Sequence, residues 1–262
     1  MAEQQLDLFA DPIGVGPNMR RAEPPIRAAE LTDTALIAAL PYAGMVTAPS
    51  LAAEAARRCL AEAVPALERL CRRLTGFGAE RVVPEQAAVL EALAAIGGEG
   101  ARHAVVRLLV QRIVQGPTLA IALNAAARLG ASLPPPRLTE LLRDARPSVR
   151  AGACRCVRSA TAHLGLLTEL LDDLHGDVAS AAAIALGRAG RVEARSALTA
   201  LLLRQPSLEL IEALAPIADE EVIVILGRIA RATPAFRQPV LKALEQIDDP
   251  RAATVARGLG PS

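Results

Sequence analysis

The chain has 262 residues, of which 52% are hydrophobic and only 2% are aromatic, with no Trp, one Tyr and three Phe. An apolar fraction of this size supports a continuous core, whereas a globular enzyme with a shaped pocket usually uses more aromatic side chains. The 29 basic residues balance 28 acidic ones, and this net charge of +1 argues against strong non-specific attraction to nucleic acids or anionic membranes.

The four cysteines are too few for a disulfide framework in a chain of this length. Cys154 and Cys156 fall in one predicted helix, where side chains two positions apart point in different directions, so they cannot share a metal ion. The N-terminus lacks the basic and apolar regions of a signal peptide, and no run approaches the ~18 apolar residues of a membrane span. We therefore expect a cytoplasmic protein without a cofactor or metal.

Residues 1–30 differ in composition from the rest of the chain. They contain Pro12, Pro17, Pro24 and Pro25, and proline blocks helix formation and removes hydrogen-bond donors. This composition predicts a disordered or extended N-terminal tail. A helical pattern begins near Leu31, with Asp33 as the expected N-cap.

A short apolar motif stands inside this tail, in the order Gln5, Leu6, Asp7, Leu8, Phe9. Three large apolar side chains in an extended segment need a groove on a partner to cover them. The motif is similar to the pentapeptide by which many bacterial proteins bind the sliding clamp of DNA replication. In that family, the Gln hydrogen-bonds at the rim of the pocket, and the Leu and Phe side chains fill an apolar groove. The alternative is that the segment caps the first repeat as a short amphipathic helix.

From residue 31 to residue 262 a signature recurs about every 30 residues, which is typical of stacked helix-turn-helix units. Residues 164–190 are the clearest unit, with a leucine-rich first helix and a second helix rich in small residues. Glycines near the ends of second helices predict C-caps at Gly97, Gly130 and Gly190, and prolines precede most second helices. The first residue of the signature is small and is expected to be buried: Cys59, Ala92, Ala125, Cys156, Ala185, Ala213 and Ala243.

Residues 144–153 resemble the HEAT repeat pattern, with Asp144 and Arg150 six positions apart around the turn between two helices. The resemblance implies an all-α, right-handed α-solenoid of about seven HEAT-like repeats, in which such Asp and Arg side chains hydrogen-bond between neighbouring repeats. The next unit has Asp173 but Ala179 in place of the arginine, which interrupts a continuous ladder. The short period resembles the HEAT-like units of bilin lyases, and glycines within 97–100 predict a joint between two stacks.

No arrangement of residues indicates catalysis. The three histidines are far apart, no phosphate-binding or nucleotide-binding fingerprint is present, and helix capping explains the acidic runs at 172–173 and 219–221. The expected function is a non-catalytic scaffold that holds protein partners in a concave groove formed by the second helices.

Arginines on the predicted second helices are the candidate groove contacts, namely Arg150, Arg155, Arg158 and Arg188. A basic groove could also hold DNA, as in the HEAT-like alkylpurine DNA glycosylases, but the near-zero net charge and the absence of the Trp residues of that family weaken this alternative. A bilin-lyase-like chaperone is the other alternative.

Overall fold

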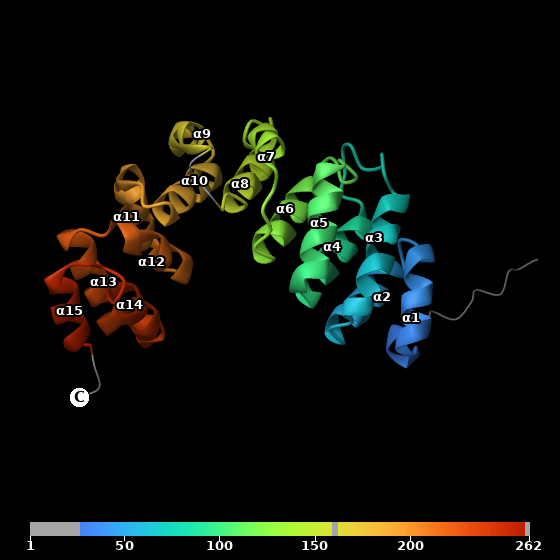
Figure 1. The fold of residues 1–262 in the computed structure, drawn as a ribbon, viewed down its shortest axis with the longest axis horizontal. Coiled ribbons are helices and arrows are strands. Elements are labelled where there is room, and N and C mark those ends of the chain that lie inside the picture. The colour runs from blue at the N-terminus through green and yellow to red at the C-terminus, as the bar shows by residue number, and fades with distance from the viewer. Residues whose placement is uncertain (1–26, 159–161, 260–262) are drawn as a thin grey trace, which may run out of the picture.

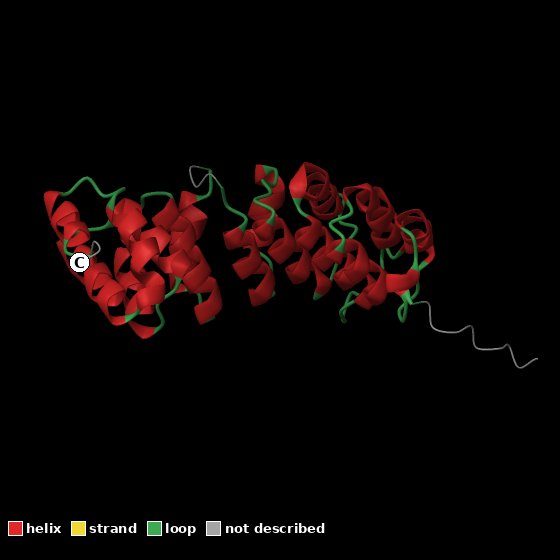
Figure 2. Ribbon diagram, turned by 90° about the horizontal axis from the view of Figure 1, so that it is seen from below, coloured by secondary structure: helices red, strands yellow, loops and turns green. Residues whose placement is uncertain are grey.

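The computed structural model describes residues 27–158 and 162–259, which form fifteen α-helices and no strands (Figures 1 and 2). The helices form seven consecutive pairs followed by a single C-terminal helix. The first helices of the pairs, with the final helix, are α1 (Asp33–Ala39), α3 (Val64–Arg73), α5 (Gly98–Val110), α7 (Pro135–Leu142), α9 (Leu164–Glu169), α11 (Arg195–Arg204), α13 (Glu220–Ala232) and α15 (Pro250–Arg257). The second helices are α2 (Ala48–Arg57), α4 (Pro84–Ile96), α6 (Thr118–Arg128), α8 (Pro147–Arg155), α10 (Gly176–Arg188), α12 (Leu208–Leu214) and α14 (Arg237–Leu244).

Short 3₁₀ turns complete several of these helices. They are η1 (Ala28–Glu30), η2 (Leu40–Tyr42), η3 (Ala61–Ala63), η4 (Leu170–Asp172), η5 (Val192–Ala194), η6 (Ala215–Ile217) and η7 (Pro234–Phe236). Within the described residues, none of the helices is long and apolar enough to cross a membrane.

The two kinds of helix form two layers, and the stack is curved (Figure 1). The even-numbered helices, which we call the inner layer, pack against one another from α2 to α14. In the outer layer of odd-numbered helices, the described residues show extensive contact between successive members at α3–α5, at α13–α15 and between α3 and η2, which continues α1. This architecture confirms the predicted α-solenoid of HEAT-like repeats, in which the closely packed layer lies on the concave side.

Left-handed C-caps end several inner helices, as the glycines predict. Gly130 and Gly190 have φ angles of 63° and 72°, a backbone conformation that glycine adopts without a steric penalty. The following residue then donates its backbone N–H back into the helix, from Arg191 to the Leu186 carbonyl at 3.0 Å. Gly97 also has a positive φ, of 72°, but its ψ of −164° is extended, and it lies between the end of α4 and the start of α5.

Cys59 takes this left-handed position in the first repeat, so the prediction that it is a buried core residue is wrong. Its φ is 52°, its side chain is exposed, and the Leu60 N–H donates to the Ala55 carbonyl at 3.0 Å. The equivalent hydrogen bond at the end of α10 runs from Arg191 to Leu186. Cys59 therefore takes the structural position of Gly190, and Glu54 takes that of Ala185. A small residue followed by leucine resembles the signature in sequence, but the position of the helix end decides which residue faces the core.

The other small signature positions are buried as predicted. Ala92, Ala185 and Ala213 are 3%, 6% and 0% exposed, and Cys156 is also buried. The Cys156 thiol donates to the Leu123 carbonyl at 3.3 Å, which joins the end of α8 to α6. Small side chains at these positions allow the inner helices to approach closely.

Ion pairs join neighbouring repeats along the solenoid. The Arg150 guanidinium donates to both carboxylate oxygens of Asp173 at 2.8 and 3.0 Å, so the predicted contact between repeats is present at this junction. Glu68 on α3 binds Arg107 on α5 in the same manner. The N-cap of α1 is Thr32 and not Asp33 as predicted, because the Thr32 hydroxyl accepts from the Ala35 N–H at 3.3 Å.

Residues 1–26 of the predicted tail, with the motif from Gln5 to Phe9, lie outside the described residues, whereas residues 28–30 form η1. The turn η1 packs against α2 just before the predicted start of the solenoid at residue 31. The predicted joint at 97–100 is the junction of α4 and α5, and α4 also packs against α6 beyond it. Flexing at this joint stays a prediction.

Candidate functional site on the concave surface

The C-terminal ends of three inner helices bring arginines together on the concave side. Arg128 is the last residue of α6, Arg155 is the last residue of α8, and Arg188 is the last residue of α10, while Arg158 follows α8 closely. A helix C-terminus favours positive charge, and the repeat places equivalent helix ends side by side. These four residues, which we call the arginine cluster, line one depression of about 360 Å³.

Hydrogen bonds hold parts of the cluster against the neighbouring helix. Arg158 Nη2 donates to the Ala127 carbonyl at 2.7 Å, and Arg155 Nη1 approaches Asn124 Oδ1 at 3.4 Å, so both side chains reach from α8 to α6. Arg188 forms an ion pair with Glu209 of α12, at 3.2 Å between nitrogen and oxygen.

Four guanidinium groups thus share this depression with one carboxylate, that of Glu209. All four arginine side chains are exposed, so each retains donors that face solvent. The chain as a whole is almost neutral, and the positive charge here is therefore a local property of the concave surface.

Arg150, the fourth arginine predicted to contact a groove partner, lies apart from the cluster. Its side chain is only 15% exposed and is held by Asp173 and by the backbone carbonyls of Asp144 and Ala145. The hydrogen bonds from Arg150 hold the pKa of Asp173 well below its usual range, at about 2. This geometry gives Arg150 a role between repeats.

Arg128, by contrast, belongs to the cluster. Its place on a predicted second helix puts it on the expected concave side, although it is not one of the four predicted groove contacts. Its sequence signal is the same as that of Arg188, an arginine in the last turn of a second helix, two residues before a capping glycine. That shared position would have identified both residues.

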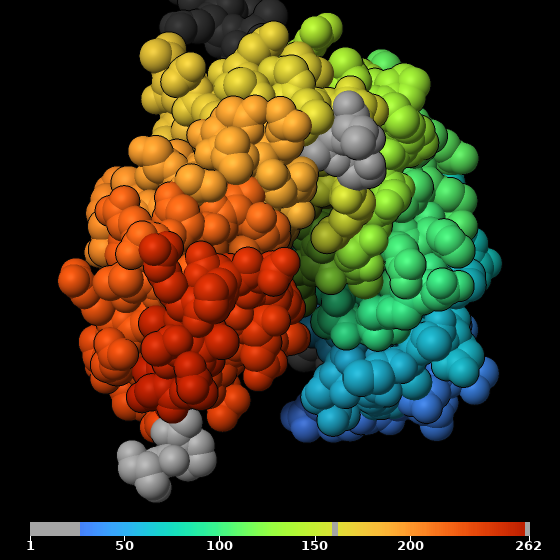
Figure 3. Space-filling view, turned by 60° about the vertical axis from the view of Figure 1, so that its left-hand side comes forward, coloured from blue at the N-terminus to red at the C-terminus, as the bar shows by residue number. Residues whose placement is uncertain are grey.

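The concave surface changes character on either side of the cluster. Toward the N-terminus, a depression of about 410 Å³ between α2 and α4 has a nearly apolar lining with one carboxylate, that of Glu91. Toward the C-terminus, a depression of about 270 Å³ is lined by Arg188, Glu212 and Lys242 among other residues of α10, α12 and α14. The hollow between the two ends of the arc is visible in Figure 3.

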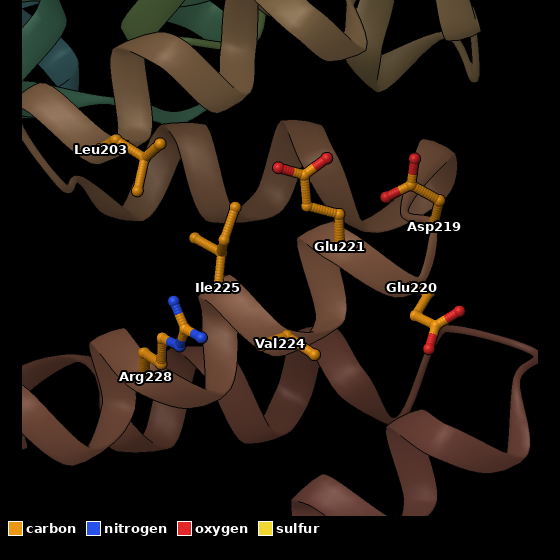
Figure 4. A pocket seen from close by; sticks show the side chains of 7 residues that line it. All are labelled: Leu203, Asp219, Glu220, Glu221, Val224, Ile225 and Arg228. Atoms are coloured by element: carbon orange, nitrogen blue, oxygen red, sulfur yellow. The ribbon is translucent and has the colours of Figure 1, made fainter.

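A second surface, between α11 and α13, has the opposite charge. A pocket of about 700 Å³ lies there, and Figure 4 shows that its lining includes Leu203 and Ile225 as well as the acidic residues at the start of α13. Asp219 is the N-cap of α13, accepts from the Val222 N–H at 3.0 Å, and pairs with Arg195 at 2.9 Å. Asp219 thus caps α13, and its ion pair with Arg195 joins α13 to α11. This agrees with the capping role that the sequence predicts for residues 219–221.

The buried thiols have no reactive environment. Burial raises the pKa of Cys71, Cys154 and Cys156 to about 12, so each is protonated at neutral pH and is a poor nucleophile. Among residues 27–158 and 162–259, no three His, Cys, Asp or Glu side chains are grouped so that they could hold a metal ion.

Comparison with known proteins supports the fold and gives no named relative. Residues 134–215, which run from α7 to η6 and include three of the four cluster arginines, match the family model of HEAT repeats. No curated protein and no solved structure matches the chain.

Proposed function

We propose that the protein is a non-catalytic binding scaffold that holds a protein partner on its concave surface. The observation that carries this proposal is the arginine cluster, four exposed guanidinium groups with one carboxylate on the inner layer. Solenoids of stacked helix pairs commonly bind partners on such concave surfaces, because the curved stack presents equivalent positions of successive repeats to one ligand.

The groove can be tested with a photo-crosslinking amino acid at Asn124, which is exposed and lines the depression. A matched variant carries the same group at Arg69, an exposed position of outer helix α3. In cells that express the protein natively, we expect Asn124 to capture a polypeptide that Arg69 does not. Equal or absent crosslinks at both positions would contradict a concave binding surface.

We further propose that residues 5–9 tether this scaffold to the bacterial sliding clamp. The support is the complete five-residue match and the need of Leu6, Leu8 and Phe9 for an apolar groove. A segment that becomes ordered on binding loses conformational entropy, so we expect a dissociation constant in the micromolar range, on the order of 10 µM.

Titration of the clamp by calorimetry tests the tether directly. The double variant Leu8→Ala with Phe9→Ala removes the apolar anchors and should abolish binding, whereas Asp7→Ser should change the affinity little. No binding of the wild-type chain at about 100 µM would disprove the tether. If deletion of residues 1–10 lowers the melting temperature by several degrees, the motif caps the solenoid instead.

A further inference from the structure

We propose that the arginine cluster recognises a short run of acidic side chains in an extended segment of the protein partner. This inference rests on the proposed concave binding surface and names the chemistry that the surface selects. The Arg128, Arg155 and Arg188 side chains lie at the ends of three successive inner helices, and Arg158 lies beside them.

Arginine is suited to carboxylates because its planar guanidinium can donate two parallel hydrogen bonds to both oxygens. Arg188 already pairs with a carboxylate of the chain, because one of its nitrogens lies 3.2 Å from one oxygen of Glu209. Its two side chains are 40% and 45% exposed, and an ion pair as exposed as this contributes little stability. A carboxylate from a partner can therefore replace Glu209 without a large cost to the fold.

The repeat geometry sets the spacing of the acidic residues. Packed helices lie about 8–10 Å apart, so cluster arginines on α6, α8 and α10 recur at roughly that interval. A peptide in the extended polyproline II conformation advances about 3.1 Å per residue with three residues per turn, so every third side chain lies on the same face at intervals of about 9 Å. The matching segment carries Asp or Glu at every third position, over about seven residues.

The charge pattern along the concave surface favours such a peptide over a nucleic acid. Glu91 lies on the N-terminal side of the cluster, Glu209 lies within its depression, and Glu212 lies on its C-terminal side together with Lys242. A nucleic acid carries uniform negative charge and would place phosphates beside these carboxylates, whereas a peptide can limit its acidic residues to the cluster.

The lining of the depression also lacks stacking platforms. Single-stranded nucleic acids are generally held by aromatic side chains on which the bases stack. Three aromatic residues, Tyr42, Phe77 and Phe236, fall within the described part of the chain, and none of them lines the depression at the cluster. The cluster therefore fits a peptide carboxylate better than a base and its phosphate.

Fluorescence polarisation of the full chain with labelled peptides tests the inference. The probe is a peptide of about ten residues with Glu at every third position, which in polyproline II places the Glu side chains on one face about 9 Å apart. The control peptide has Gln in place of each Glu, and labelled single-stranded and duplex oligonucleotides of similar charge are measured in parallel. We expect the Glu peptide to bind, the Gln peptide to bind at least about tenfold more weakly, and binding to weaken with salt.

Charge-reversal variants locate the interaction. Arg128→Glu with Arg155→Glu should reduce the affinity for the Glu peptide about tenfold or more, because these side chains line the depression. Arg69→Glu with Arg231→Glu makes the same change of charge on exposed positions of outer helices α3 and α13 and should bind as the wild type does. Equal melting temperatures for both double variants would establish that the fold is retained.

Three outcomes would overturn the inference, namely no binding of the Glu peptide, tighter binding of the oligonucleotides, or equal loss in both double variants. The crosslinking experiment at Asn124 distinguishes failure of this inference from failure of the proposed concave binding surface. A polypeptide captured at Asn124 whose crosslinked segment lacks acidic residues would keep the concave binding surface and reject its acidic ligand. A captured segment with Asp or Glu at every third position would support both.

Discussion

The inner and outer layers of the solenoid use different side chains at their contacts. In the inner layer, a Cβ placed on Gly152 would lie 2.8 Å from the Leu123 Cβ, so α8 and α6 approach more closely than larger residues permit. In the outer layer, α11 and α13 stand apart, and Leu203 between them is 63% exposed beside the pocket of Figure 4.

This difference accounts for both the curvature and the site. Small residues bring the inner helices together while the outer helices spread, so the stack bends toward the inner layer (Figure 1). The bend turns the C-terminal ends of α6, α8 and α10 toward one shared depression, where their arginines meet. The same arginines on a straight stack would line a flat surface.

Ala185→Arg should cause the largest loss of stability, because it places an unpaired guanidinium at a position that is 6% exposed within the inner layer. We expect the free energy of unfolding to fall by about 4 kcal/mol. The melting temperature should then drop by about 10 °C. Ala200→Arg on outer helix α11, where the side chain is exposed, should stay within about 0.5 kcal/mol of wild type. Similar thermal unfolding of the two variants would refute the assignment of the layers.

Gly187→Ala should have the next largest effect. Its new Cβ would lie 2.5 Å from the Ala213 carbonyl oxygen and 2.5 Å from the Leu198 Cδ1, so α12 must shift away from α10. We expect a loss of about 1–3 kcal/mol in urea unfolding. The matched control is Gly165→Ala in outer helix α9, where no atom lies within 4 Å of the new Cβ. That variant should be neutral or slightly more stable than wild type, because alanine favours helix.

Asp173→Asn should reduce stability by about 2 kcal/mol, between the values typical of exposed and buried ion pairs. It removes the negative charge and one of the two oxygens that accept from Arg150 at the junction of two repeats, where the Asp173 side chain is 8% exposed. The neighbouring Asp172→Asn, at an exposed position, is the control and should change little. Equal losses of unfolding free energy in both variants would show that the Arg150–Asp173 ion pair does not itself stabilise the junction.

The same pair predicts a pH dependence. The folded pKa of Asp173 is about 2, below its usual value of 3.8. Its contribution to the free energy of unfolding is therefore fully present above about pH 4 and is lost as the pH falls toward 2. The difference in unfolding free energy between wild type and Asp173→Asn should therefore shrink over that interval. A difference in unfolding free energy that stays constant down to pH 2 would contradict the lowered pKa of Asp173 and its assignment to the hydrogen bonds from Arg150.

Thiol labelling has no expected effect on stability and tests the corrected position of Cys59. In the native protein at pH 8 we expect one fast thiol, Cys59, because Cys71, Cys154 and Cys156 are buried with pKa values of about 12. All four should react in urea. Rapid native labelling of more than one thiol would indicate that the core is less closed than described.

Much of this architecture could be predicted from the sequence because it depends on local chemistry. Small residues at a period of about 30, glycines such as Gly130 and Gly190 after the helices, and acids at the start of α13 each determine a local structure. The Asp and Arg pattern likewise predicted contacts between repeats, and Arg150 with Asp173 forms one of them.

Only the tertiary structure decided which residues face the core and which face a partner. Cys59 matches the signature in sequence, yet the helix end places it at an exposed left-handed cap. Arg150 and Arg188 are both arginines of second helices, but one is held between repeats and the other lines the concave depression. These assignments depend on where each helix ends and how closely its neighbours pack, and both are set by contacts between residues about 30 positions apart.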